Sequence, residues 1–191
     1  MPKPSKRNQL VAATKELLWE AGYEGMSPRD IQVRSAARPG SLYHHFPSKL
    51  AIAQAALEEA AAEEIAHLEE IFSADTAPLE AVRHYLLLKR DAFRGCRFGR
   101  LVHETSIEHE ELRRPIANYF NAVCNHIARS LAQAQLDGTL GASLDPENLA
   151  VSLTAVIQGG YVLARTFQNE ALMYRVTEGA LAMIPEVDRS K

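Results

Sequence analysis

Apolar residues recur along most of the chain at the three- and four-residue spacing of amphipathic helices. Near the N-terminus, Leu10, Ala13, Leu17 and Ala21 follow this spacing, and Gly22 comes where a helix is expected to end. Strand-like alternation of apolar and polar residues is missing from the sequence, and the helix-favouring residues Ala, Leu, Glu and Arg are abundant. The pattern therefore predicts an all-α protein.

Prolines, glycines and capping residues divide the chain into predicted helices. Ser27 and Asp30 resemble a capping box, and Ser48 is expected to cap a long helix. After the first helix, we expect helices at 28–34, 39–45, 49–72, 77–94, 99–107, 111–136, 146–168 and 171–183. Two short helices joined by a tight turn are typical of a helix-turn-helix. The sequence thus predicts a three-helix DNA-binding domain over 1–50 and a helical bundle over 51–191.

Charge distinguishes the two predicted domains. The 191-residue chain has a formal net charge of −3. Its first 50 residues nevertheless contain eight Lys and Arg against four acidic residues. A basic N-terminal domain on an acidic body indicates a polyanionic partner such as nucleic acid, and chance scatter of surface charge is the alternative. Two cysteines without a CxxC motif, the lack of a signal-like N-terminus and the lack of a long apolar run favour a cytoplasmic protein without a membrane span.

The sequence carries no recognisable catalytic or metal-binding motif. The adjacent His44 and His45 point about 100° apart on a helix, so they do not converge on one metal ion. His103 and His109 are six residues apart, whereas a zincin helix needs histidines about four apart. We therefore expect no metal, no cofactor and no enzyme activity. An enzyme that uses a pocket in the C-terminal domain, and a purely structural helical protein, remain alternatives.

The stretch GSLYHHFPSK has the pattern of a DNA-reading surface. On a helix, Leu42 and Phe46 lie four residues apart and face the core, which leaves Ser41, Tyr43 and the histidines on the other arc. The small Gly40 and Ser41 allow close approach to a groove. Lys49 is placed where its ammonium group and the start of the next helix can share a phosphate. Arg29, with Lys6 and Arg7 on a flexible N-terminal arm, is expected to add backbone contacts; the alternative is that Tyr43 and one histidine pack the core.

The segments GYEGMSPRDI and GSLYHHFPSKLAI resemble the DNA-binding head of the TetR family of bacterial transcriptional regulators, over about residues 8–55. The resemblance implies an all-helical homodimer of about nine helices that binds a palindromic double-stranded DNA operator. Together with the residue pattern, it gives a predicted DNA-facing set of Lys6, Arg7, Ser27, Arg29, Arg38, Pro39, Gly40, Ser41, Tyr43, His44, His45 and Lys49. Two positions depart from the family pattern. Ala36 replaces a turn glycine, and an alanine there must avoid or tolerate a positive φ at a cost of about 1 kcal/mol. Arg38–Pro39 replaces a Ser-Lys pair.

The C-terminal domain is similar to one branch of the same family in FRGCRFGRLVHETS, LRRPIANYF and VSLTAVIQGGYVLARTF. The last of these segments contains stripes of small residues that permit close helix approach, either between two chains or within one. We expect a dimer interface at Ser152, Ala155, Val156, Gly159, Gly160 and Leu163.

The resemblance further implies a small-molecule effector in the C-terminal domain and a repressor that the effector releases from DNA. The effector-site candidates are His67, Tyr85, Cys96, Phe98, His103, Tyr119, Phe120 and Tyr161, each of which has packing in the core as its alternative. A different mechanism would use Cys96 as an electrophile or oxidant sensor, because Arg94 and Arg97 favour its thiolate form.

Overall fold

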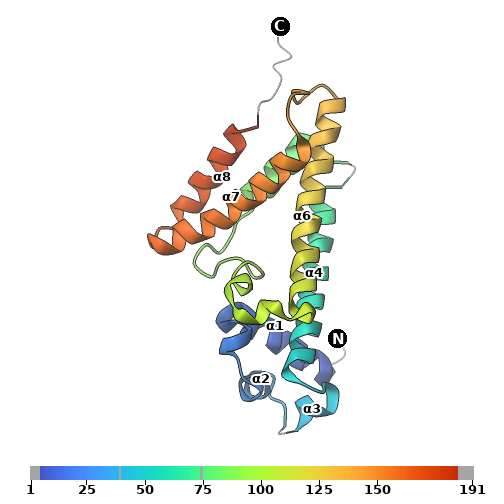
Figure 1. The fold of residues 1–191 in the computed structure, drawn as a ribbon, viewed down its shortest axis with the longest axis vertical. Coiled ribbons are helices and arrows are strands. Elements are labelled where there is room, and N and C mark those ends of the chain that lie inside the picture. Colours follow the sequence, from blue (N-terminus) through green and yellow to red (C-terminus); the bar gives the residue numbers. More distant parts are fainter. Residues whose placement is uncertain (1–4, 39, 74, 185–191) are drawn as a thin grey trace. The chain divides into compact units, whose positions relative to one another are not determined.

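The structure is a computed structural model that describes residues 5–38, 40–73 and 75–184 (Figure 1). Its described residues form eight α-helices and two 3₁₀ helices, which confirms the all-α prediction with one α-helix fewer than expected. The helices are α1 (Lys6–Gly25), α2 (Pro28–Arg34), α3 (Ser41–His45), α4 (Lys49–Ile71), α5 (Pro78–Leu87), η1 (Leu101–His103), η2 (Thr105–Glu108), α6 (Glu110–Leu136), α7 (Pro146–Thr166) and α8 (Ala171–Ala182).

The chain forms two compact units, and each is built from separate stretches of sequence. The head unit comprises the described residues up to Glu63 together with Cys96–Asn118. The body unit comprises Glu64–Gly95 and the described residues from Tyr119 onward. The predicted division into a DNA-binding domain over 1–50 and a C-terminal domain over 51–191 stays a prediction.

The head unit is held together by buried residues from its first four helices. Leu10 of α1, Ile31 of α2, Leu42 of α3 and Ile52 of α4 are all fully buried. A polar contact adds to this core, since the Lys15 ammonium lies 2.8 Å from a Glu59 carboxylate oxygen and 2.6 Å from one of Glu63. Burial lowers the pKa of Lys15, but the two carboxylates outweigh burial and the pKa is raised overall. α1 is therefore fixed on α4, and α2 and α3 pack against α1.

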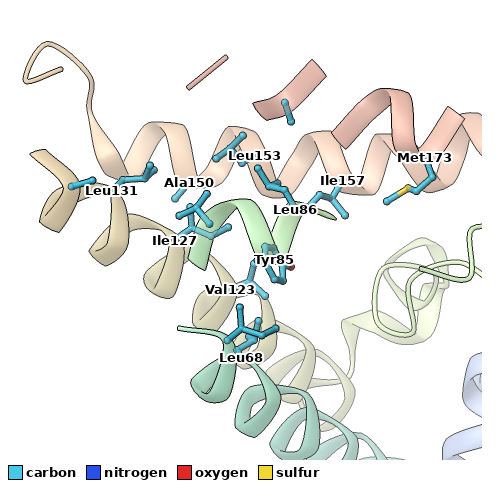
Figure 2. Packing of buried hydrophobic residues seen from close by; sticks show 14 of the residues in the cluster. Leu68, Tyr85, Leu86, Val123, Ile127, Leu131, Ala150, Leu153, Ile157 and Met173 are labelled. Carbon is cyan, nitrogen blue, oxygen red and sulfur yellow. The ribbon is translucent and has the colours of Figure 1, made fainter. Parts of the chain in front are cut away.

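The body unit has its own hydrophobic core, which Figure 2 shows. Leu68 from the end of α4, Leu86 from α5, Ile127 from α6 and Leu153 from α7 meet there. α8 packs against both α5 and α7. By length and composition alone α7 could cross a membrane, with 21 residues and a mean hydropathy of 1.2. Its buried Leu153 and other apolar residues place it in this core instead.

Two predicted helices differ from the structure. The helix expected at 77–94 ends at Leu87, because Leu88 is extended (φ −50°, ψ 135°). The Arg90 guanidinium donates hydrogen bonds to the carbonyls of Tyr85, Leu86 and Leu88 at 2.6–2.9 Å. It thereby supplies donors for carbonyl groups at the C-terminal end of α5. The helix expected at 99–107 was also wrong, since η1 and η2 occupy this region and Glu104 between them is extended.

Candidate nucleic-acid interface

α2 begins with the capping box that its sequence predicts. The Ser27 hydroxyl accepts a hydrogen bond from the Asp30 N–H at 3.2 Å, and the Asp30 carboxylate accepts from the Ser27 N–H at 2.8 Å. The Ser27 hydroxyl also donates to that carboxylate at 2.6 Å. Hydrogen bonds from the Ser27 side chain and backbone lower the pKa of Asp30. Ser27 therefore fixes the start of α2, and its predicted contact with DNA stays a prediction.

The turn between α2 and α3 contains Ala36 with a positive φ of 49°. The chain thus tolerates the left-handed conformation at the position where the family pattern has glycine. The ammonium of Lys6 donates to the Ala36 carbonyl at 3.3 Å and to the side chain of Gln9 at 2.8 Å. Lys6 is the first residue of α1, so the expected flexible arm does not include Lys6 or Arg7. α1 starts earlier than predicted because the Ser5 hydroxyl caps it by accepting from the Asn8 N–H at 3.2 Å.

α3 has one buried face and one exposed face. Leu42 is fully buried and Phe46 is 5% exposed, as predicted, whereas Tyr43 is 56% exposed. His44 and His45 are also exposed, and their rings meet edge to face at 5.0 Å. This arrangement rules out the alternative that Tyr43 or a histidine packs the core. It leaves three neighbouring polar aromatic rings on the solvent side of a short helix.

The start of α3 differs slightly from the prediction. The helix begins at Ser41, because Gly40 has a φ of 83° and precedes it in the left-handed region. Ser41 is half-buried and Gly40 is exposed. Pro39, where the helix was expected to begin, lies outside the described residues. Gly40 thus gives the turn a conformation that other residues adopt only with strain.

Basic side chains of the head unit come from α1, α2, the turn before α3 and the start of α4. Arg29 and Arg38 are exposed, and the Arg7 guanidinium lies 5.2 Å from the centre of the Phe46 ring. Lys49 is the first residue of α4, and its ammonium lies 4.2 Å from the centre of the Tyr23 ring. The Ser48 hydroxyl caps α4 by accepting from the Ala51 N–H at 3.1 Å. The head therefore combines exposed aromatic residues with cations, which is the chemistry that contacts bases and phosphates.

The eight effector-site candidates lie in both units. Cys96, Phe98 and His103 belong to the head unit, and only His103 of these is exposed. The body unit contains exposed His67, buried Tyr85, and the half-buried Tyr119, Phe120 and Tyr161. Tyr85, Tyr119 and Tyr161 belong to the body core or pack against it. A groove of about 860 Å³ in the body unit is lined by other residues, namely Cys124, Asn125, Ala128, Arg129, Ala132, Ser143, Leu144, Asp145, Pro146, Glu147 and Val151.

The surroundings of Cys96 do not favour its role as a sensor. Its side chain is only 9% exposed, and its sulfur accepts a hydrogen bond from the Gly99 N–H at 3.3 Å. The Arg97 guanidinium lies over the Trp19 ring, 4.5 Å from its centre, and 3.6 Å from the Glu16 carboxylate. Arg97 is thus engaged with α1. Among the described residues, no His, Cys, Asp and Glu side chains come together as a metal site.

The small-residue stripes on α7 separate into two surfaces. Gly160 is buried, and a Cβ at this position would lie 2.7 Å from the Met173 sulfur of α8. Gly160 therefore packs within the chain, which is the alternative to its predicted place in a dimer interface. Ser152, Ala155 and Leu163 are exposed, and a Cβ at Gly159 would meet nothing within 4 Å. Val156 is half-buried against the body core.

The structure also contains a polar cluster in the head unit that the sequence did not predict. The Glu104 carboxylate accepts hydrogen bonds from the backbone N–H groups of Tyr23 and Glu24 at 2.9 and 3.1 Å. The Arg100 guanidinium donates to the carbonyls of Trp19 and Glu20 at 2.5 and 2.9 Å. In the segment HETSIEH the spacing of the two histidines does not fit one metal ion, and nothing local marks Glu104 as a partner of α1. A helix that breaks at Gly22 leaves backbone N–H groups that need acceptors. This need was the one feature of the sequence that could have predicted a distant carboxylate at the end of α1.

Two family models match the chain. The model for bacterial regulatory proteins of the tetR family matches residues 10–56. The model for the tetracyclin repressor-like C-terminal domain matches residues 76–180. Together they cover the helix-turn-helix and most of the C-terminal domain.

The chain is also similar in sequence to individual transcriptional regulators. The chain is 28% identical over 172 residues to an HTH-type transcriptional regulator in the lacX 3′ region of Lactococcus lactis subsp. lactis, which covers 85% of each chain. It is 24% identical over 196 residues to the HTH-type transcriptional repressor DhaR of Mycobacterium sp. (strain GP1), covering 98% of this chain and 97% of DhaR.

Solved structures share the fold. The reduced form of Escherichia coli NemR has a TM-score of 0.86 at 22% identity, covering 96% of this chain and 98% of NemR. A cysteine mutant of the TetR family regulator CifR, complexed with 26-bp operator DNA, has a TM-score of 0.80 at 24% identity, covering 97% and 100%. The helix-turn-helix geometry and these matches lead to one conclusion: the chain belongs to the TetR family and is a DNA-binding transcriptional regulator.

Proposed function

We propose that the protein is a repressor that binds a palindromic operator through α3 and is released by a small molecule bound in its C-terminal domain. One observation carries the proposal, namely the exposure of Tyr43, His44 and His45 above the buried Leu42 and Phe46. A helix with this division can enter a major groove and keep its hydrophobic face in the head. Such a regulator acts in the cytoplasm, where the DNA is.

In this proposal each group of side chains has its own task. Tyr43, His44 and Ser41 contact base edges, while the cations contact phosphates and set the register on the duplex. The set of contacts with phosphates or with the groove edge is Lys6, Arg7, Ser27, Arg29, Arg38, Pro39, Gly40, His45 and Lys49. Lys6 and Arg7 have partners within the chain, so a phosphate contact requires their ammonium or guanidinium group to make a further bond.

A homodimer is part of the proposal, because a single short reading helix contacts too few base pairs for specificity. The exposed face of α7 around Ser152, Ala155, Gly159 and Leu163 supplies the surface. Exposed Val162, which is 60% exposed, and Phe167, which is 66% exposed, extend its apolar character. Apolar side chains exposed on one face of a helix favour burial against a partner. Gly160 is not part of this surface.

Release by an effector is explained by a shift between two populations. A ligand that binds one arrangement of the dimer more tightly favours that arrangement, and two reading helices at the wrong separation no longer fit successive major grooves. The similarity to DhaR, described as a repressor, supports repression rather than activation. The effector candidates in the body unit are Tyr119, Phe120, Tyr161, Tyr85 and His67, with Cys96, Phe98 and His103 in the head unit.

Fluorescence anisotropy with DNA from upstream of the protein's own gene tests the proposal. We expect tight, salt-sensitive binding that scrambled DNA does not reproduce. We expect Tyr43→Ala to weaken it about 5- to 150-fold, because a good base contact is worth about 1–3 kcal/mol. Val33→Ala is the matched control, since Val33 is 74% exposed on α2 but is outside the predicted set. Equal weak binding to both DNAs, unchanged by Tyr43→Ala, would reject the proposal. If binding is specific, the complex serves as the assay for compounds that release the protein from DNA.

A further inference from the structure

α1 is interrupted near its C-terminal end, and Glu104, about 80 residues later, accepts hydrogen bonds from the amides after the break. Gly22 has a φ of 80° and a ψ of 176°, which breaks the helix within the span Lys6–Gly25. The amide groups of Tyr23 and Glu24 follow this break, and both donate to one oxygen of the Glu104 carboxylate. A Cβ at residue 22 would lie 1.6 Å from the other oxygen, so only glycine admits the carboxylate.

The contact is reciprocal within the head unit. The Glu24 carboxylate accepts a hydrogen bond from the Ser106 N–H at 2.9 Å, and the Ser106 hydroxyl donates to Glu104 at 3.2 Å. Arg100 adds its two bonds to the carbonyls at the end of α1. These charge-assisted bonds fix the backbone of Tyr23 on the η1–η2 segment, since hydrogen bonds to ionised groups are stronger than neutral ones.

The side chain of Tyr23 extends from this fixed backbone to a cation of the DNA-binding surface. Its ring lies under the Lys49 ammonium, with 4.2 Å between the nitrogen and the ring centre. A cation held over an aromatic face keeps N–H donors for another partner, because an ammonium has three of them. Lys49 is the first residue of α4, and the dipole of the helix favours an anion at this end.

We propose that Tyr23, held in place by Glu104, is a positioning residue for DNA binding: its ring orders the Lys49 ammonium for contact with a backbone phosphate. The inference rests on the DNA interface of the proposed function. A lysine side chain has four rotatable bonds, and ordering it before binding reduces the entropy lost in the complex. Neither Tyr23 nor Glu104 needs to touch DNA for this effect.

The test is a double-mutant cycle measured by fluorescence anisotropy on the operator across a salt series. Lys49→Met removes the phosphate contact, so it should weaken binding and reduce the slope of log affinity against log salt by about 0.9. Tyr23→Leu should weaken binding about 3- to 10-fold when Lys49 is present, and Tyr23→Phe, which keeps the ring face, should restore the affinity. In the Lys49→Met background, Tyr23→Leu should have no further effect.

The outcomes separate this proposal from a general loss of structure. A Tyr23→Leu effect of equal size in both backgrounds, or the same loss with Tyr23→Phe, would overturn it. Glu104→Ala and the conservative Glu104→Gln take the place of the Tyr23 variants in a second cycle with Lys49→Met. This second cycle is the test if thermal unfolding shows that Tyr23→Leu is not folded. If Lys49→Met left affinity and salt slope unchanged, this inference would fail while the operator binding of the wild type and its loss in Tyr43→Ala still supported the proposed function.

Discussion

The close approach of α7 and α8 makes Gly160 a sensitive position. An added Cβ would lie 2.7 Å from the Met173 sulfur and 3.2 Å from a methyl carbon of Val176. Met173 is only 4% exposed, so it has little room to move away. Overpacking of this kind costs about 1–3 kcal/mol, while replacing a glycine within a helix by alanine stabilises by about 1 kcal/mol. We therefore expect Gly160→Ala to lower the free energy of unfolding by about 0–2 kcal/mol.

A double-mutant cycle with Met173→Ala isolates the contact. Met173→Ala alone should cost about 2–5 kcal/mol. In that background Gly160→Ala should stabilise by up to about 1 kcal/mol, because the overlapping sulfur is gone and only the 3.2 Å contact with Val176 remains. Urea unfolding followed by circular dichroism at one protein concentration gives the four free energies. Gly179→Ala on α8, where a Cβ meets nothing within 4 Å, reports the helix-propensity effect alone. The reasoning is refuted if Gly160→Ala changes stability equally in both backgrounds.

Three further predictions concern the turn, a histidine and the dimer. Stability should follow the order Gly, Ala, Val at Ala36, because its φ of 49° disfavours larger side chains; urea midpoints in another order would contradict this. Burial, together with the positive charge of Arg129, lowers the pKa of His126 against the opposing effect of Glu69, so the unfolded chain binds a proton more readily than the folded one. The stability that neutral His126 contributes is present above the unfolded pKa and is lost as pH falls toward the lowered pKa of the folded state. The urea midpoint of the wild type should therefore fall between about pH 7.5 and about pH 5, and His126→Phe should make this fall smaller. Equal falls in the two proteins would contradict this prediction. Ala155→Arg should convert the proposed dimer to a monomer in size-exclusion chromatography with light scattering and weaken operator binding. A persistent dimer would remove this face from the interface.

Local signals in the sequence were sufficient for α2 and for the buried face of α3. The capping box at Ser27 and Asp30 fixes the start of α2 within a few residues of sequence. The four-residue spacing of Leu42 and Phe46 alone determines which face of α3 is buried. The break at Gly22 was also predicted from its position after an apolar pattern. Each of these features depends on neighbours in the chain, and that is why the sequence revealed them.

Features that depend on distant contacts were missed. The region 99–107 has helix-forming residues, yet Glu104 is extended because its carboxylate binds amides about 80 positions earlier. The end of α5 at Leu87 depends on how Arg90 folds back onto three carbonyls. Gly159 and Gly160 of α7 look alike in sequence, and only the position of Met173 shows that Gly160 is the one covered within the chain. The effector site also depends on such contacts, and its residues remain predictions.

The inclusion of Cys96–Asn118 in the head unit limits how this protein can be recombined with relatives. A chimera joined shortly after the helix-turn-helix would receive α1 without Glu104 and Arg100, which bind its last turn from about 80 positions away. The amides of Tyr23 and Glu24 would then face whatever residue the other parent supplies. Successful exchange of DNA specificity should therefore transfer both stretches together, or graft only the exposed residues of α3. Gly22 is constrained in two ways, because its φ of 80° and ψ of 176° disfavour any side chain and the Glu104 carboxylate occupies the place where a Cβ would lie.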